Sequence, residues 1–166
     1  MKLIGVIFVL LSAFSVGIRV ASGLRKRCEY LERFIDVLCL MSNELSFMTT
    51  PLPFVFLAAS EKAAGNLKTI LLLVAEQMEK NRWMSPETAV EIALNHQPDE
   101  LIGEVLKNLA GKLGSYDVQA QLAGIDAAVK DTERLLQALE VEMSVRSKTY
   151  KTLSICAGLA LVILLI

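Results

Sequence analysis

The chain has 166 residues, of which 54% are hydrophobic and 21% charged, and its mean hydropathy is +0.49. Its formal net charge of −1 excludes the broad basic field with which proteins attract nucleic acid, so we expect no nucleic-acid partner. Four prolines, nine glycines and little alternation of β-branched residues predict an all-α protein. The high mean hydropathy comes mainly from the two ends of the chain, which predicts membrane lipids as partners.

The N-terminus begins with an apolar segment, residues 1–23. No charge interrupts Leu3–Ile18, and Arg19 can extend its side chain to the interface, so the segment is long enough to span a bilayer. The alternative is a signal peptide cleaved after Ser22, because small residues follow the apolar stretch there. Arg19 lies where a cleavage region is usually uncharged, which favours an uncleaved membrane segment.

The distribution of basic residues predicts the orientation of the central region, residues 24–151. Only Lys2 precedes the first apolar segment, whereas seven basic residues flank the central region: Arg19, Arg25, Lys26, Arg27, Arg146, Lys148 and Lys151. By the positive-inside rule this region is a cytoplasmic domain.

Apolar periodicity, prolines and caps divide the central region into an antiparallel bundle of about six helices. We expect Ser85 to cap one helix, Gly65-Asn66 to end another, and Gly114 to adopt a left-handed conformation after a third. The expected helices are a first one from Leu24 to the Thr49–Pro53 break, then Phe54–Ala64, Leu67–Arg82, Pro86–His96, Leu101–Leu113 and a last one from Val118. The expected core includes Leu38, Leu45, Leu71, Leu109, Ile125 and Leu139.

The last helix is expected to begin in water and to end in lipid. Its first half has an apolar stripe of period about 3.5, which suits packing on another helix. No charge follows Lys151, and residues 152–166 are predicted to form a C-terminal membrane segment. These fifteen residues span about 22 Å as a helix, which is short for a hydrocarbon core of roughly 30 Å. A buried core helix is the alternative.

The sequence offers no constellation for catalysis, so we expect no enzyme, no cofactor and no metal site. His96, the one histidine, is predicted to lie in solvent at a helix end without ligands at metal-binding spacing. Glu44 lies near the apolar face of the first helix, where a structural ion pair or cap is a better interpretation than acid–base chemistry.

Three stretches of the chain follow one another in an order that matches a known family. The first is Glu44–Phe47 leading into Thr50-Pro51-Leu52, the second is Leu113–Asp117 with Gln121 following, and the third runs from Lys148 to Gly158. With the chain length and both apolar ends, they resemble the stage III sporulation protein AB family of endospore-forming bacteria. The sequence departs from the family at Phe47-Met48, where Tyr-Gly is common.

The resemblance implies a domain similar to the cytoplasmic helical bundle of the type II secretion platform protein F. It further implies a place in a channel complex in the mother-cell membrane around the forespore, with a secretion-type ATPase and other channel-complex membrane proteins as partners. The residues expected to form the ATPase docking site are Glu44, Thr50, Pro51, Leu52, Leu113, Gly114, Asp117 and Gln121. A simpler interpretation is that these residues only shape turns.

A second function stays open at the level of sequence. If the first segment is cleaved, or if the topology is reversed, the chain is an exported or membrane-anchored helical sensor or adaptor that faces outside. The side of the membrane on which the central domain lies discriminates between the two functions.

Overall fold

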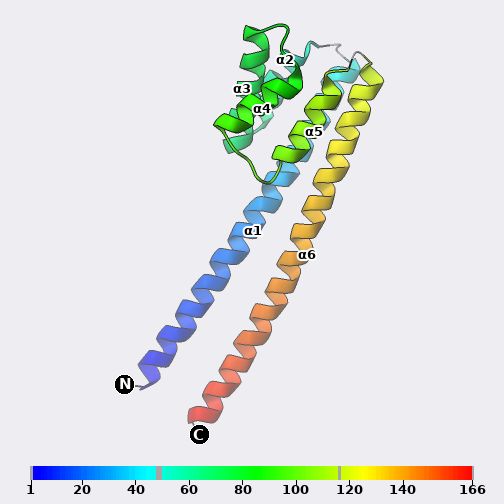
Figure 1. Cartoon of the computed structure of the whole chain (residues 1–166). Helices are drawn as coiled ribbons and strands as arrows, with labels where there is room; N and C mark the ends of the chain where they lie inside the picture. Colours follow the sequence, from blue (N-terminus) through cyan, green and yellow to red (C-terminus); the bar gives the residue numbers. More distant parts are fainter. Residues whose placement is uncertain (1, 48–49, 116, 166) are drawn as a thin grey trace. The chain divides into compact units, whose positions relative to one another are not determined.

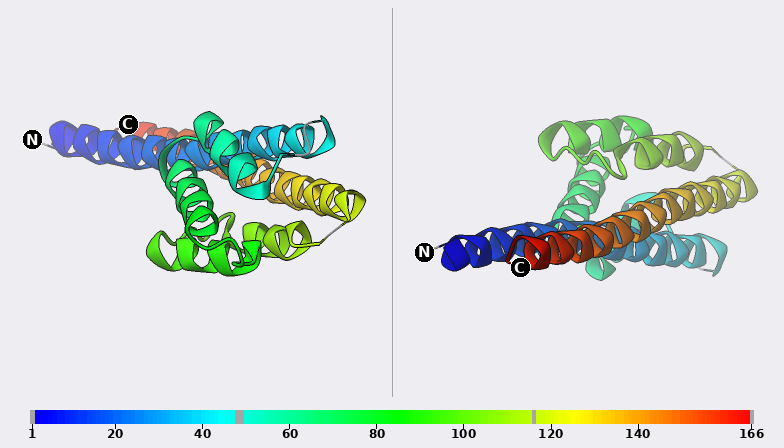
Figure 2. Two further views of the ribbon diagram at one scale, coloured as in Figure 1. Left: turned by 90° about the horizontal axis from the view of Figure 1, so that it is seen from above. Right: turned by 90° about the horizontal axis from the view of Figure 1, so that it is seen from below.

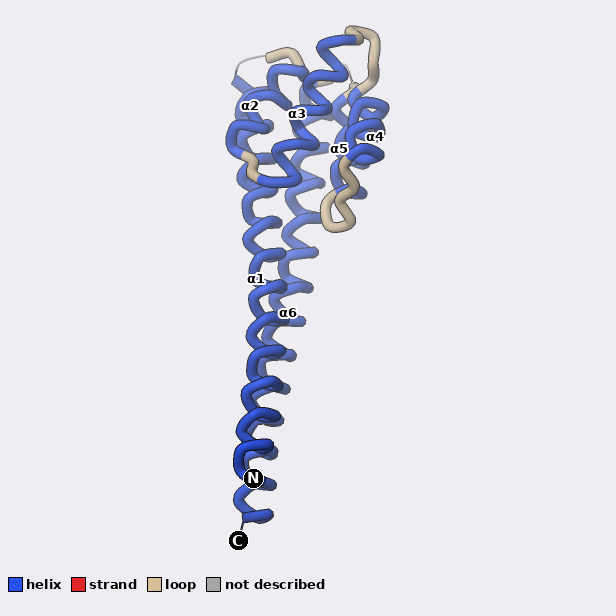
Figure 3. The backbone as a smooth tube through the Cα atoms, turned by 90° about the vertical axis from the view of Figure 1, so that its left-hand side faces the viewer, coloured by secondary structure: helices blue, strands red, loops and turns tan. Residues whose placement is uncertain are grey.

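The computed structural model describes residues 2–47, 50–115 and 117–165, and the surroundings of side chains within 22–145. Throughout these ranges the secondary structure is helical, without strands (Figure 3). The helices are α1 (Lys2–Phe47), α2 (Leu52–Lys62), α3 (Gly65–Lys80), α4 (Pro86–His96), α5 (Gly103–Leu113) and α6 (Val118–Leu165). The predicted all-α class and the six helices are confirmed.

The chain forms two compact units whose boundaries fall inside α1 and α6. Unit 1 comprises Met1–Tyr30 and Leu136–Ile166, and unit 2 comprises Leu31–Leu135. In unit 1 the two long helices run antiparallel and side by side (Figures 1 and 2). Leu24 and Cys28 are buried on α1, one helical turn apart.

The predicted membrane segments, residues 1–23 and 152–166, fall almost entirely outside the range of described side chains. Within that range, no helix combines the length and the apolar character needed to cross a bilayer. Membrane insertion of the two ends therefore stays a prediction.

Consecutive helices of unit 2 alternate in direction and enclose one apolar core (Figures 1 and 3). The largest fully buried side chains are Leu31, Phe34, Leu38, Met41, Phe56, Leu67, Ile70, Leu71, Ile102, Leu106, Leu109 and Leu113. Of the residues expected in the core, all but one are buried. Leu139 is only half-buried, because it lies on the part of α6 that belongs to unit 1, where one neighbouring helix covers only part of the surface of α6.

Side-chain acceptors fix the start of α4 and the turn that precedes α5. Ser85 Oγ accepts a hydrogen bond from the Thr88 amide at 3.2 Å, which confirms the predicted start of α4. Asp99 Oδ1 accepts from the amides of Leu101 and Ile102 at 3.0 and 3.1 Å, just before α5. These bonds satisfy donors that have no partner inside the helix.

The predictions for two glycines were wrong. Gly65 does not end α2, which stops at Lys62, but is the first residue of α3 and has a φ of 60°. The extended Ala63 and Ala64 lead away from α2, and the left-handed glycine turns the chain into α3. Gly114 has a φ of −72° and stays in the right-handed region, because the Ser115 amide closes the end of α5 on the Lys112 carbonyl at 3.2 Å.

Side-chain hydrogen bonds join the connections at one end of unit 2. Asn66 Nδ2 donates to Asp99 Oδ2 at 2.8 Å and to the Pro98 carbonyl at 3.3 Å. Residues that follow the α2–α3 connection are thereby tied to the α4–α5 connection, more than thirty positions further along the chain.

Candidate docking surface

The first predicted motif folds into the connection between α1 and α2. Thr50 Oγ1 donates a hydrogen bond to Glu44 Oε2 at 3.3 Å, so the partner of Glu44 is a hydroxyl and not the expected basic group. The Pro51 carbonyl accepts from the amides of Phe54 and Val55 at 2.9 and 3.2 Å and thereby starts α2. Leu52 is the first residue of that helix and is half-buried.

The second motif folds into the connection between α5 and α6. Gln121 Nε2 donates to the Ser115 carbonyl at 2.6 Å, and Ser115 Oγ donates to the Asp117 carbonyl at 3.2 Å. Asp117 Oδ1 accepts from the Gln119 amide at 3.0 Å and caps α6. Leu113 is fully buried, whereas Tyr116 lies outside the described residues.

The two motifs lie at the same end of unit 2. Figures 1 and 2 show the C-terminal end of α1 beside the N-terminal end of α6. The α3–α4 connection lies at this end as well (Figures 1 and 3), and a Cβ placed on Gly114 would lie 3.7 Å from Pro86 Cδ at the start of α4. We call this end, formed by the described residues 50–51, 81–85, 114–115 and 117, the connection end.

Large apolar side chains that sequence reasoning missed are exposed at the connection end. Trp83 in the α3–α4 connection is 96% exposed, Phe47 at the end of α1 is 83% exposed, and Phe54 in the first turn of α2 is 54% exposed. Val118 opens α6 and is also exposed. The available signal was the position of these aromatic residues: Phe47 and Phe54 flank the predicted break at Thr49–Pro53, and Trp83 lies just before the predicted cap Ser85.

A close contact between α5 and α6 sets the position of the second motif. A Cβ added to Gly124 would lie 2.5 Å from Lys112 Cβ, a separation that real side chains do not adopt. Gly124 therefore allows α6 to lie directly against the last turn of α5. The sequence does not predict this contact, because a glycine can occur inside a helix for several different reasons.

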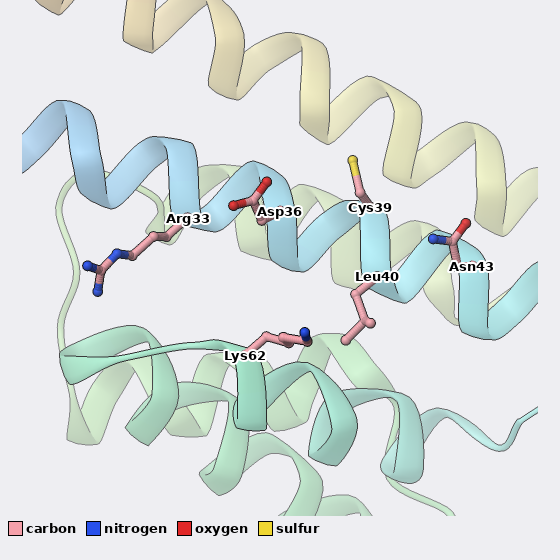
Figure 4. Close-up of a pocket in the computed structure, with 6 residues that line it drawn as sticks. All are labelled: Arg33, Asp36, Cys39, Leu40, Asn43 and Lys62. Carbon is pink, nitrogen blue, oxygen red and sulfur yellow. The ribbon is translucent and has the colours of Figure 1, made fainter.

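A shallow groove of about 330 Å³ lies on unit 2 and is lined by Arg33, Asp36, Cys39, Leu40, Asn43 and Lys62. The side chains of Lys62 and Leu40 point toward each other, whereas Asp36 and Cys39 point away from Lys62 (Figure 4). Cys39 is a free, exposed thiol. The groove thus holds a nucleophile but no base directed at it, and these residues do not form a catalytic arrangement.

His96 and Lys130, in the described part of the chain, do not belong to a catalytic or metal site. His96 is exposed at the end of α4, as predicted. Residues 22–145 contain no group of three or more histidine, cysteine or carboxylate side chains that could hold a metal ion. The hydrogen bond that Lys130 Nζ donates to Asp126 Oδ2 and the attraction of the carboxylate charge raise the pKa of Lys130, and the two residues form an exposed ion pair on α6.

The fold and the site define an all-helical protein whose candidate site is an exposed surface built from helix connections. A family model described as stage III sporulation protein AB matches residues 2–166. The chain therefore belongs to the stage III sporulation protein AB family, a family of sporulation proteins that is not a known enzyme family.

Two comparisons with individual proteins agree with this assignment. The chain is 26% identical to the stage III sporulation protein AB of Bacillus subtilis strain 168 over 170 residues, which cover 99% of each chain. It also resembles a solved structure of a stage III sporulation protein AB, with a TM-score of 0.64 and 22% identity over 72% of this chain and 97% of the other. The solved structure shows the same fold.

Proposed function

We propose that the chain is a non-enzymatic membrane platform in a sporulation complex similar to a secretion channel. In this role the connection end docks a cytoplasmic secretion-type ATPase on the mother-cell side. The observation that carries the proposal is the meeting of the first two family motifs at one exposed end of unit 2. A platform between a motor and a membrane needs a rigid helical unit with such an exposed end.

The two apolar ends of the chain provide the attachment in this proposal. Both belong to helices, α1 from Lys2 and α6 to Leu165, and both belong to unit 1. Membrane lipids and the other membrane proteins of the channel complex are the partners proposed for these ends. The location is the mother-cell membrane around the forespore, with unit 2 in the cytoplasm.

A direct binding measurement tests the docking role. The full chain is reconstituted in lipid nanodiscs, and binding of the purified ATPase of the same organism is measured by biolayer interferometry. We expect saturable binding to loaded nanodiscs and none to empty ones. Equal signals from loaded and empty nanodiscs would refute the docking function.

A further inference from the structure

The connection end differs from the rest of unit 2 in its exposed aromatic side chains. Each of its three connections contributes at least one large apolar residue: Phe47 and Phe54 flank the first, Trp83 lies in the second, and Val118 follows the third. At the opposite end, the described residues 63–66 and 97–102 include no large exposed apolar side chain. Of the two ends of unit 2, the connection end is therefore the one with large apolar side chains that a partner could cover.

The polar groups of the two motifs have partners within the chain. The Thr50 hydroxyl, the Gln121 amide and the Asp117 carboxylate each make a hydrogen bond that shapes a turn. These bonds explain the motif residues without a partner protein. The exposed apolar side chains beside the motifs have no such explanation.

The charges around the connection end nearly cancel, which excludes two classes of partner. Residues 43–55 contain one acidic side chain, residues 79–88 contain two acidic and two basic ones, and residues 112–121 contain one of each. Anionic lipid surfaces and nucleic acids attract clusters of basic residues, which this end lacks. Exposed aromatic residues with balanced charge are typical of the centre of a protein–protein interface.

The exposed aromatic area is large enough to anchor such an interface. Burying Trp83, Phe47 and Phe54 would cover roughly 500 Å², if each ring contributes 150–250 Å² in proportion to its exposure. A specific interface of standard size covers about 800 Å² on each partner. These three side chains would therefore supply more than half of that area.

We propose that the connection end binds its partner through Trp83, Phe47, Phe54 and Val118, which enter apolar pockets on a protein surface of little net charge. The inference rests on the proposed function, since it assigns this partner to the docked ATPase. The family motifs then act indirectly, by holding the aromatic side chains in position.

The test compares two substitutions at the connection end with one elsewhere on unit 2. Trp83→Ser and Phe54→Ser remove exposed anchors, whereas Leu72→Ser removes an exposed leucine from α3. Binding of the ATPase to each full-length variant in nanodiscs is measured at low and at high salt, and circular dichroism verifies the fold. We expect Trp83→Ser to weaken binding at least tenfold, Phe54→Ser to weaken it by a smaller factor, and Leu72→Ser to leave it unchanged. We also expect less than a threefold change with salt.

Each result decides between clear alternatives. If the wild-type chain binds the ATPase and Trp83→Ser binds equally well, the aromatic surface is refuted while the docking function stands. A steep loss of binding with salt would assign docking to charged side chains and would also overturn the inference. If the wild-type chain does not bind the ATPase, the docking function fails, and the inference fails with it.

Two other occupants of the connection end are tested with the same variants. Self-association is followed by sedimentation, and lipid binding by flotation with vesicles of phosphatidylglycerol and phosphatidylethanolamine. If Trp83→Ser abolishes either activity but preserves ATPase binding, the surface belongs to a second copy or to lipid, and the inference is overturned.

Discussion

The Thr50 hydroxyl and the Glu44 carboxylate lie six positions apart and meet across the end of α1. Gln121 and Ser115 form a similar pair at the start of α6. In both cases the hydrogen bond joins a residue that follows a connection to one nearer its start. At the scale of single residues, the simpler interpretation of the family motifs, that they shape turns, therefore agrees with their geometry.

Thr50→Val removes one of these hydrogen bonds while keeping the shape of the side chain. We expect the free energy of unfolding of the full chain in detergent to fall by about 0.5–1.5 kcal/mol, because a half-buried carboxylate oxygen loses its donor. Thr69→Val is the control, since the exposed Thr69 hydroxyl contacts only a carbonyl of its own helix. Weaker ATPase binding at unchanged stability would contradict a purely structural role for Thr50.

Gly124→Ala tests the contact between α5 and α6. The new methyl group would overlap Lys112 Cβ, and we expect a loss of about 1–3 kcal/mol in the free energy of unfolding. Gly111→Ala on α5 is the matched control, because nothing lies within 4 Å of its Cβ position. This second change should stabilise the chain by about 0.5–1 kcal/mol through helix propensity. Stabilisation by both substitutions would refute the close approach.

At the scale of helices, the sequence predicted the elements better than their ends. Ser85-Pro86 gave the start of α4 because a hydroxyl cap and a proline both act at the first turn. The conformations of Gly65 and Gly114 were predicted wrongly because a glycine alone is a less specific signal. A glycine permits a left-handed residue but does not show whether the chain uses it to leave a helix, to enter one, or at all.

Ser85→Ala measures how much the cap of α4 contributes. The Thr88 amide loses its acceptor, and we expect the free energy of unfolding to fall by about 1 kcal/mol. Ser46→Ala, at an exposed position near the end of α1, should have little effect. Equal losses in the two variants, measured by thermal unfolding, would argue against a specific capping contribution.

At the scale of the whole molecule, the sequence located the motifs at the correct breaks but not the surface that they support. The family pattern predicted which residues form two of the connections. The hydrogen bonds within those connections are of the kind that turn residues usually make. Trp83 was missed because its importance depends on two connections distant in sequence that lie at the same end of unit 2. The period of the helices carries no information about which connections meet.

The orientation of unit 2 can be measured without inserting a reporter. Cys39 is an exposed free thiol and Cys28 is buried, so a membrane-impermeant maleimide reports the side on which Cys39 lies. In a Cys156→Ser background, which removes the third cysteine of the chain, we expect a cytoplasmic unit 2 to be labelled only after the cells are permeabilised, and a further Cys39→Ser change should abolish the labelling. Labelling of intact cells would instead support the exported adaptor.

The way in which the chain segments are divided between the two units has a consequence for folding during synthesis on the ribosome. Unit 2 is one continuous run, Leu31–Leu135, whereas unit 1 joins the first part of the chain to the last. Domains usually fold as units while translation proceeds at about 5–20 residues per second. All three connections of the connection end precede Leu136. We therefore expect unit 2 to fold from one continuous stretch of the chain, whereas unit 1 cannot form until the C-terminal part has been made.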